Sequence, residues 1–178
     1  MKSDLRFDRK TLLGLTVLSV GFYVAMQSLE SLEQSLLSPV TTTAAAPMPT
    51  QSLPIVAHIK LGNRTIELEV ARSVSERAIG LMGRDALPAD RGMLFVVEPP
   101  RNVRIWMQGM EIPLDIVFLR EGVITAISSN VPPCEVQECP RYEAGVAVDH
   151  VLEIGAGEAA ALGWKVGDRV DVILPGKL

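Results

Sequence analysis

The regular alternation of apolar and polar residues is the feature that most constrains the fold of this chain. From residue 55, the stretch "IVAHIKLGNRTIELEV" places apolar residues at every second position on both sides of Gly62-Asn63. Successive side chains of a strand point to opposite faces, and a two-residue turn of this type joins antiparallel strands. The stretch therefore predicts a β-hairpin with one buried face.

Similar patterns predict further strands, with a tight turn at Glu121-Gly122; they cover residues 92–98, 102–107, 114–120, 123–129, 146–154 and 169–175. Ser73 with Glu76 three residues later is a capping box, which predicts a short helix ending at Gly83. A second helical turn is expected in "EAAALG" at 158–163. The predicted fold class is mostly β with one or two short helices, in a compact β-sandwich or barrel of about seven strands.

An uncharged apolar segment, Thr11 to Leu29, precedes these patterns and follows four basic residues, Lys2, Arg6, Arg9 and Lys10. About 20 apolar residues can cross a bilayer, and basic residues before such a span stay in the cytoplasm. We therefore predict a single-pass protein of the inner or an equivalent membrane. Its parts are a cytoplasmic basic region at 1–10, a single transmembrane helix at 11–29, a flexible linker at 30–54 and an extracytoplasmic β-rich domain at 55–178.

A cleaved signal peptide is the alternative for the same segment, and it would leave a secreted or periplasmic protein. Cleavage needs small residues just after the apolar run. Tyr23 and Met26 stand there instead, and the first Ala-x-Ala pattern, at 44–46, is far downstream. An uncleaved anchor is therefore favoured.

The charge of the chain argues against a nucleic-acid partner. It has 21 acidic and 17 basic residues, a net charge of -4, and its basic residues form no run. A surface that follows phosphates needs clustered Lys and Arg. The membrane is the predicted partner through the N-terminal span, and the sequence leaves open whether a small ligand or a protein binds the domain.

Five blocks of the sequence resemble the bacterial and archaeal family called domain of unknown function 192; they are "ERAIGLMGR", "RGMLFVVE", "IWMQGMEIPLDIVFL", "YEAGVAVDHVLEIGAG" and "GWKVGDRV". The resemblance begins near residue 55 and implies a small β-rich fold without an established reaction. Members of that family commonly have Trp-Met-Lys-Asn-Thr where this chain has Trp106, Met107, Gln108, Gly109 and Met110. This chain thus has a glycine turn and an extra thioether in place of the polar trio that the resemblance implies.

The chain has only two cysteines, Cys134 and Cys139, with four residues between them. Outside the cytoplasm, such a close pair is most often a disulfide that closes a loop. A redox-active pair is the alternative, although oxidoreductase motifs have two residues between the cysteines. Zinc would need more ligands, and His58 and His150 are the only histidines. A structural disulfide is predicted.

Four methionines fall in separate blocks that are expected to fold together; they are Met82, Met93, Met107 and Met110. Thioethers suit Cu(I), and the indole of Trp106 could contact a cation. The favoured interpretation is that these side chains fill gaps in the core and that the protein needs no cofactor, because methionine adapts to irregular spaces. A copper site is the alternative.

An aspartate inside an apolar strand needs a partner. Both alternating sets of "PLDIVFLR" are apolar, so Asp115 is expected to be buried and paired. Arginine is the expected partner, and Arg77 or Arg84 on the edge of the predicted helix could reach it. The candidate binding pocket consists of Arg77, Met82, Arg84, Met93, Trp106, Met107 and Asp115.

The sequence contains no recognised catalytic motif such as G-x-S-x-G, H-E-x-x-H or a Walker loop. We therefore expect a binding or scaffold domain without catalytic residues. Two alternatives stay open. One is Cu(I) binding through the methionines and Trp106, and the other is an enzyme built on Arg77, Arg84 and Asp115.

If residues 11–29 are an uncleaved anchor, the full-length chain will stay in the membrane fraction after high-salt washing. Added protease will then reach the domain only from the outer side. Fractionation with immunodetection measures both properties. A soluble form that begins between residues 27 and 47 would show a cleaved signal instead.

Overall fold

A computed structural model describes residues 49–174 of the chain. The predicted basic region, the predicted span and most of the predicted linker lie outside the described residues. Within residues 49–174, no helix is both long and apolar enough to cross a membrane.

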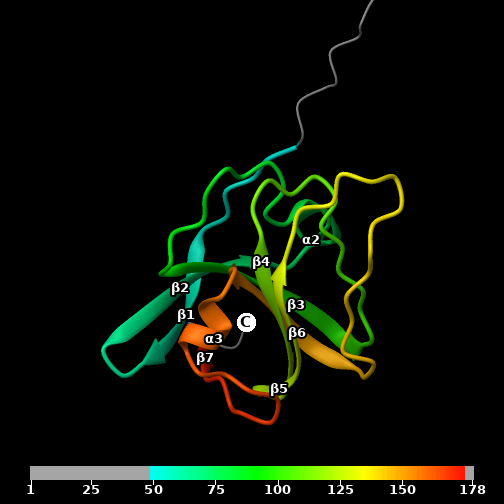
Figure 1. Ribbon diagram of the computed structural model, residues 1–178. Coiled ribbons are helices and arrows are strands. Elements are labelled where there is room, and N and C mark those ends of the chain that lie inside the picture. Colours follow the sequence, from blue (N-terminus) through cyan, green and yellow to red (C-terminus); the bar gives the residue numbers. More distant parts are fainter. Residues whose placement is uncertain (1–48, 175–178) are drawn as a thin grey trace, which may run out of the picture. The chain divides into compact units, whose positions relative to one another are not determined.

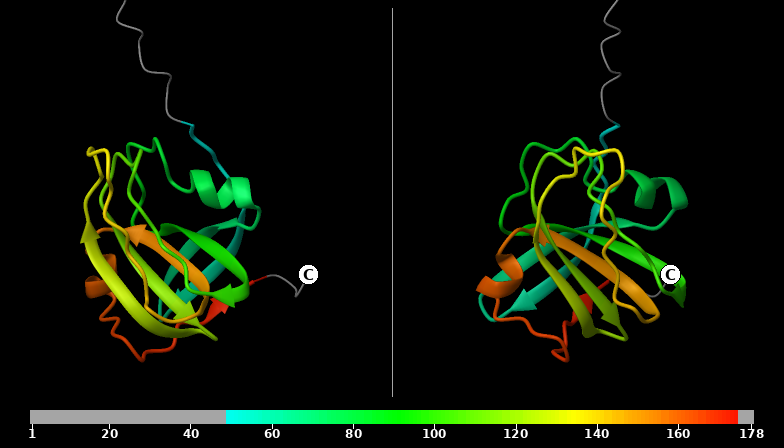
Figure 2. Two further views of the ribbon diagram at one scale, coloured as in Figure 1. Left: turned by 90° about the vertical axis from the view of Figure 1, so that its right-hand side faces the viewer. Right: turned by 45° about the vertical axis from the view of Figure 1, so that its right-hand side comes forward.

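The described residues form seven strands and two short helices. In chain order these are β1 (Ile55–Leu61), β2 (Arg64–Ala71), α2 (Val74–Ile79), β3 (Arg91–Arg101), β4 (Leu114–Arg120), β5 (Val123–Val131), β6 (Val148–Gly155), α3 (Glu158–Ala161) and β7 (Val172–Ile173). The strands make one sheet in the order β5-β4-β6-β3-β2-β1-β7, antiparallel except for the parallel pair β2 and β3. The sheet is strongly curved, and the loops 102–113 and 132–147 rise together at the end of the domain where α2 lies (Figures 1 and 2).

The mostly β fold class is confirmed, but the predicted sandwich or barrel is wrong because this single sheet stays open. Its edge strands, β5 and β7, do not pair with each other. The segment just before β7 makes only an isolated antiparallel bridge to the start of β5, between Val123 and Arg169. Backbone hydrogen bonds accompany the bridge, among them the Ile124 amide to the Asp168 carbonyl at 2.9 Å. The alternation of apolar and polar residues indicates which faces of a strand are buried. Closure of a sheet into a barrel depends on pairing between its two edge strands, which the alternation does not encode.

Local signals predicted most of the elements well. The hairpin of β1 and β2 is confirmed, with Leu61 opposite Arg64 across the turn. The strand predicted at 102–107 is wrong, because this segment makes only an isolated bridge between Ile105 and Tyr142. The capping box at Ser73 is confirmed, but the helix ends at Gly80, earlier than predicted, where the backbone takes a φ of 53°.

Both faces of the sheet are buried. One face carries a core that includes Leu94, Leu152 and Ala159 of α3. The opposite face carries a second core that includes Phe95 and Val151. Buried residues of β4 and β6 alternate between the two cores, which explains why both alternating sets of these strands are apolar.

Asp115 is buried, as predicted, but the expected arginine partner is wrong. Its carboxylate accepts three backbone N–H groups, from Asn130 at 2.7 Å, Gly157 at 3.0 Å and Ala159 at 2.8 Å. The physical reason is that Asp115 and the two arginines lie on opposite faces of the sheet. Asp115 points to the face that carries α3, whereas Arg77 and Arg84 belong to the face near α2.

Arg84 instead holds the start of the domain against β2. Its guanidinium pairs with Glu69 at 2.6 Å and donates to the Gln51 carbonyl at 2.8 Å. Burial alone would raise the pKa of Glu69, but hydrogen bonds from Arg84 and from the Leu53 amide outweigh it and lower the pKa below its usual value. The contacts of the domain therefore extend back to Gln51, a few residues before β1.

Replacing Asp115 tests whether this carboxylate holds α3 to the sheet. Asp115→Ala leaves three buried backbone N–H groups without an acceptor, so we expect a loss of about 3 to 5 kcal/mol in the free energy of unfolding. The matched control is Asp168→Ala, which removes a single exposed bond to the Lys165 amide and should cost under about 1 kcal/mol. Urea denaturation measures both. Strong coupling between Asp115→Ala and Arg84→Met would contradict the backbone-only assignment.

Candidate functional site

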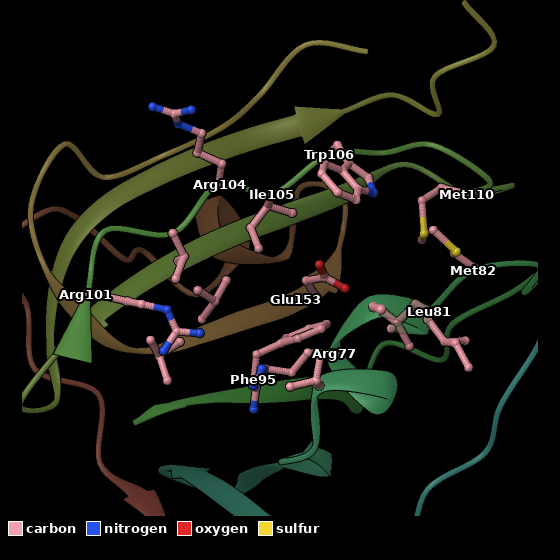
Figure 3. Close-up of a pocket in the computed structure, with 17 residues that line it drawn as sticks. Arg77, Leu81, Met82, Phe95, Arg101, Arg104, Ile105, Trp106, Met110 and Glu153 are labelled. Atoms are coloured by element: carbon pink, nitrogen blue, oxygen red, sulfur yellow. The ribbon is translucent and has the colours of Figure 1, made fainter. Parts of the chain in front are cut away.

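A hollow of about 320 Å³ opens between α2, β3, β6 and the segment that follows β3. Most of its lining side chains are apolar, among them Leu81, Phe95, Ile105, Trp106 and Met110. Small-molecule sites typically measure roughly 300 to 1,000 Å³ and share this mostly apolar character. Figure 3 shows the hollow with its lining side chains.

Glu153 of β6 is the only acidic residue that lines this hollow. The side chain is 5% exposed, and no hydrogen-bond partner for it occurs within residues 49–174. Its carboxyl group lies in the middle of the lining side chains in Figure 3. No fully buried side-chain oxygen or nitrogen of the described residues lacks a partner, so the Glu153 oxygens open onto the hollow, where a ligand can reach them.

The surroundings of Glu153 decide its protonation state. Its register neighbours on the two flanking strands are apolar, Met93 on β3 and Ile116 on β4. Burial raises the pKa of Glu153 to about 8, because a low-dielectric environment disfavours the charged form. The carboxyl is therefore protonated at neutral pH and can donate a hydrogen bond to a ligand.

Gly80 keeps the hollow open beside this carboxyl. A Cβ atom at this position would lie 3.2 Å from Cζ of Phe95 and 4.0 Å from Oε2 of Glu153. The positive φ of Gly80, which ends α2, is also costly for a residue with a side chain. Glycine at this position thus permits the backbone conformation that ends α2, and its missing side chain leaves space in front of Glu153.

Three arginines line the hollow, and they differ in how they are engaged. Arg104 pairs with Glu143 at 3.3 Å and points away from the other labelled side chains in Figure 3. Arg77 donates to the carbonyls of Arg72 and Val96. Arg101 has no carboxylate partner within the described part of the chain and makes only a 3.4 Å contact with the Pro99 carbonyl.

Trp106 forms a wall of the hollow and is 42% exposed. Its indole is covered by Arg141, whose Cζ lies 4.8 Å from the ring centroid, a cation–π contact. Met82 and Met110 line the same hollow, and their sulfur ends approach one another in Figure 3. An aromatic surface and two thioethers therefore meet in this part of the site.

The structure brings together only part of the predicted candidate pocket. Arg77, Met82 and Trp106 line the hollow, and Met110 from the proposed methionine set joins them. Met93 and Met107 are buried in the core next to it. Arg84 and Asp115 lie elsewhere, in the structural contacts given above.

Sequence reasoning missed Glu153, although a signal was present. In "VAVDHVLEI" a glutamate stands within a predicted strand whose neighbouring residues are apolar. A charged residue in a strand that is buried on both faces needs a partner, and this is as true of Glu153 as of Asp115.

The predicted disulfide between Cys134 and Cys139 is confirmed, with an S–S distance of 2.06 Å. It closes the loop next to Trp106, where the Cys134 amide donates to the Met107 carbonyl at 3.1 Å. The bridge thus supports the segment that carries a wall of the hollow.

The chain belongs to the family domain of unknown function 192, described as Uncharacterized ACR, which matches residues 57–172. This confirms the resemblance read from the sequence. No curated protein matches the chain.

Two solved structures are similar to it. A protein of unknown function from Novosphingobium aromaticivorans DSM 12444 is 33% identical and has a TM-score of 0.60, and the match covers 75% of this chain and 96% of that one. A protein from Sinorhizobium meliloti 1021, provisionally described as a transcription regulator, is 35% identical with a TM-score of 0.57, and the match covers 66% of this chain and 91% of that one.

The raised pKa of Glu153 predicts a specific dependence of stability on pH. The folded protein retains this proton up to about pH 8, whereas the unfolded chain releases it near 4.5. Stability from this group is therefore fully present below pH 4.5 and is lost as the pH rises to about 8, by at most about 1.4 kcal/mol per pH unit. Glu153→Gln should remove this slope, and urea denaturation at several pH values measures it.

The matched control is Glu111→Gln, at an exposed position outside the hollow. It should leave the slope between pH 5 and 8 as it is in the wild type. Equal slopes in the wild type and Glu153→Gln would show that Glu153 is not protonated in the folded state.

Proposed function

We propose that the domain is a binding module for a small organic molecule with an apolar body, anchored to the outer side of a membrane by residues 11–29. The observation that carries the binding proposal is Glu153, a buried carboxyl without a described protein partner inside an apolar hollow. The carboxyl is accessible through the hollow, since no fully buried side-chain oxygen of the described residues lacks a partner. A ligand in the hollow can therefore accept its hydrogen bond.

The composition of the lining favours binding over catalysis. The side chains around the hollow include no serine, threonine, cysteine, histidine or lysine. Nucleophilic and acid–base reactions need a second reactive group within hydrogen-bond reach of the first. Glu153 and the arginines that line the hollow with it include no nucleophile, and they are suited to hold and orient a ligand.

Cu(I) binding is a second candidate, favoured by the approach of Met82 and Met110 beside Trp106 (Figure 3). Thioethers are ligands that suit Cu(I), and the indole face could contact the ion. The described residues contain no group of three or more His, Cys, Asp or Glu side chains that could hold a metal. Such a site would therefore depend on the two thioethers and the indole.

Fluorescence of Trp106 can test small-molecule binding. The chain has two tryptophans, so Trp164→Phe leaves Trp106 as the only reporter. In this background, 2-phenylethanol should change the emission saturably, with a dissociation constant of roughly 1 mM or tighter. Val103→Phe would fill the hollow and should weaken binding by at least about fivefold.

Val166→Phe is the matched control, since it makes the same change at a valine that is 63% exposed and outside the hollow. It should leave the titration unchanged, and circular dichroism verifies that both variants fold. No saturable change, or identical curves for the two variants, would contradict the proposal. Quenching by Cu(I) that is lost in both Met82→Leu and Met110→Leu would favour the metal candidate instead.

A further inference from the structure

We infer that the hollow takes an amphipathic organic anion, such as a small carboxylate, whose charged group binds on the Arg101 side of Glu153 and whose apolar body extends toward Met82 and Met110. This inference rests on the proposed function and adds the charge of the ligand and its orientation. In Figure 3, Arg101 lies on one side of Glu153, and the two thioethers lie on the other.

The charges around the hollow favour an anion. Three arginines and a single acidic residue line it. Two of the arginines are already engaged, Arg104 by Glu143 and Arg77 by backbone carbonyls. Arg101 retains most of its donors, and a guanidinium with unused donors binds a carboxylate well. A cationic ligand would have to approach past all three guanidinium groups.

Glu153 fits this ligand only when it carries its proton. An ionised Glu153 would repel an anion, whereas the protonated acid donates a hydrogen bond to it. The charged groups that line the hollow with Glu153 are Arg77 from α2, Arg101 from β3 and Arg104 from the following segment. The strands on either side present apolar neighbours. Burial, which raises the pKa of Glu153 to about 8, thus matches the site to an anion at neutral pH.

The other side of the hollow suits an apolar body. Leu81, Met82 and Met110 lie there in Figure 3, and the indole of Trp106 lines the hollow with them. These side chains offer aliphatic, thioether and aromatic surface. Hydrophobic burial and contacts of sulfur or ring edges can hold an alkyl or aryl group there. The two kinds of lining therefore match the two ends of one amphipathic molecule.

Three probes of nearly the same size and shape test the inference: phenylacetate, 2-phenylethanol and 2-phenylethylammonium. They are titrated at pH 7 into the full-length Trp164→Phe chain in neutral phosphatidylcholine vesicles, with Trp106 emission as the signal. Phenylacetate should bind about tenfold tighter than the alcohol, and the ammonium should bind most weakly. Arg101→Gln should bring phenylacetate to the affinity of the alcohol. Arg120→Gln, the matched control at an arginine that pairs with Glu121 outside the hollow, should retain the preference.

Glu153→Gln separates the role of the proton from a general loss of structure. Glutamine keeps a neutral donor, so this variant should bind phenylacetate equally at pH 7 and pH 9. The parent chain should bind it more weakly at pH 9, where Glu153 is ionised.

The outcomes distinguish the two proposals. Equal affinities for the three probes, or tightest binding of the ammonium, would overturn the anion inference and leave the proposed function standing. An unchanged preference in Arg101→Gln would overturn the proposed orientation. If none of the probes binds, the proposed function fails, and the inference fails with it.

Discussion

The burial of both faces of β6 is the constraint on which the candidate site depends. This strand lies between β4 and β3 and pairs with both, so its backbone groups are used within the sheet. Leu152 and Ile154 pack into one core, and Val151 packs into the other. Glu153 is therefore cut off from bulk solvent except through the hollow. Its protonation and its lack of a protein partner both follow from this position.

Two buried acidic residues on neighbouring strands have different roles in this domain. Asp115 of β4 and Glu153 of β6 lie one register position apart but on opposite faces of the sheet. Asp115 accepts three backbone hydrogen bonds, which join α3 to β4 and also link β4 to Asn130 of β5. Glu153 receives no hydrogen bond from the described residues, although arginines line the same hollow. The first acid is part of the fold, and the second is the group around which we propose a ligand binds.

Irregular segments form much of the wall of the site. Residues 102–113 leave the sheet after β3 and carry Trp106 and Met110, and the disulfide loop supports them through Arg141 and Cys134. The lining of the hollow is thus set in part by loops that stand on the sheet, and changes in such loops alter which ligand fits without changing the fold.

The sequence by itself determined the β-rich class, the β1–β2 hairpin, the capping box at Ser73 and the disulfide, because each depends on residues close together in the chain. It also indicated that Asp115 is buried, since the apolar residues around it are local. Only the tertiary structure decided that the sheet stays open, that backbone amides and not arginine satisfy Asp115, and that Glu153 lies in a hollow with Arg101 and Trp106. These features depend on contacts between residues far apart in sequence, and alternation specifies which residues are buried without specifying what they meet.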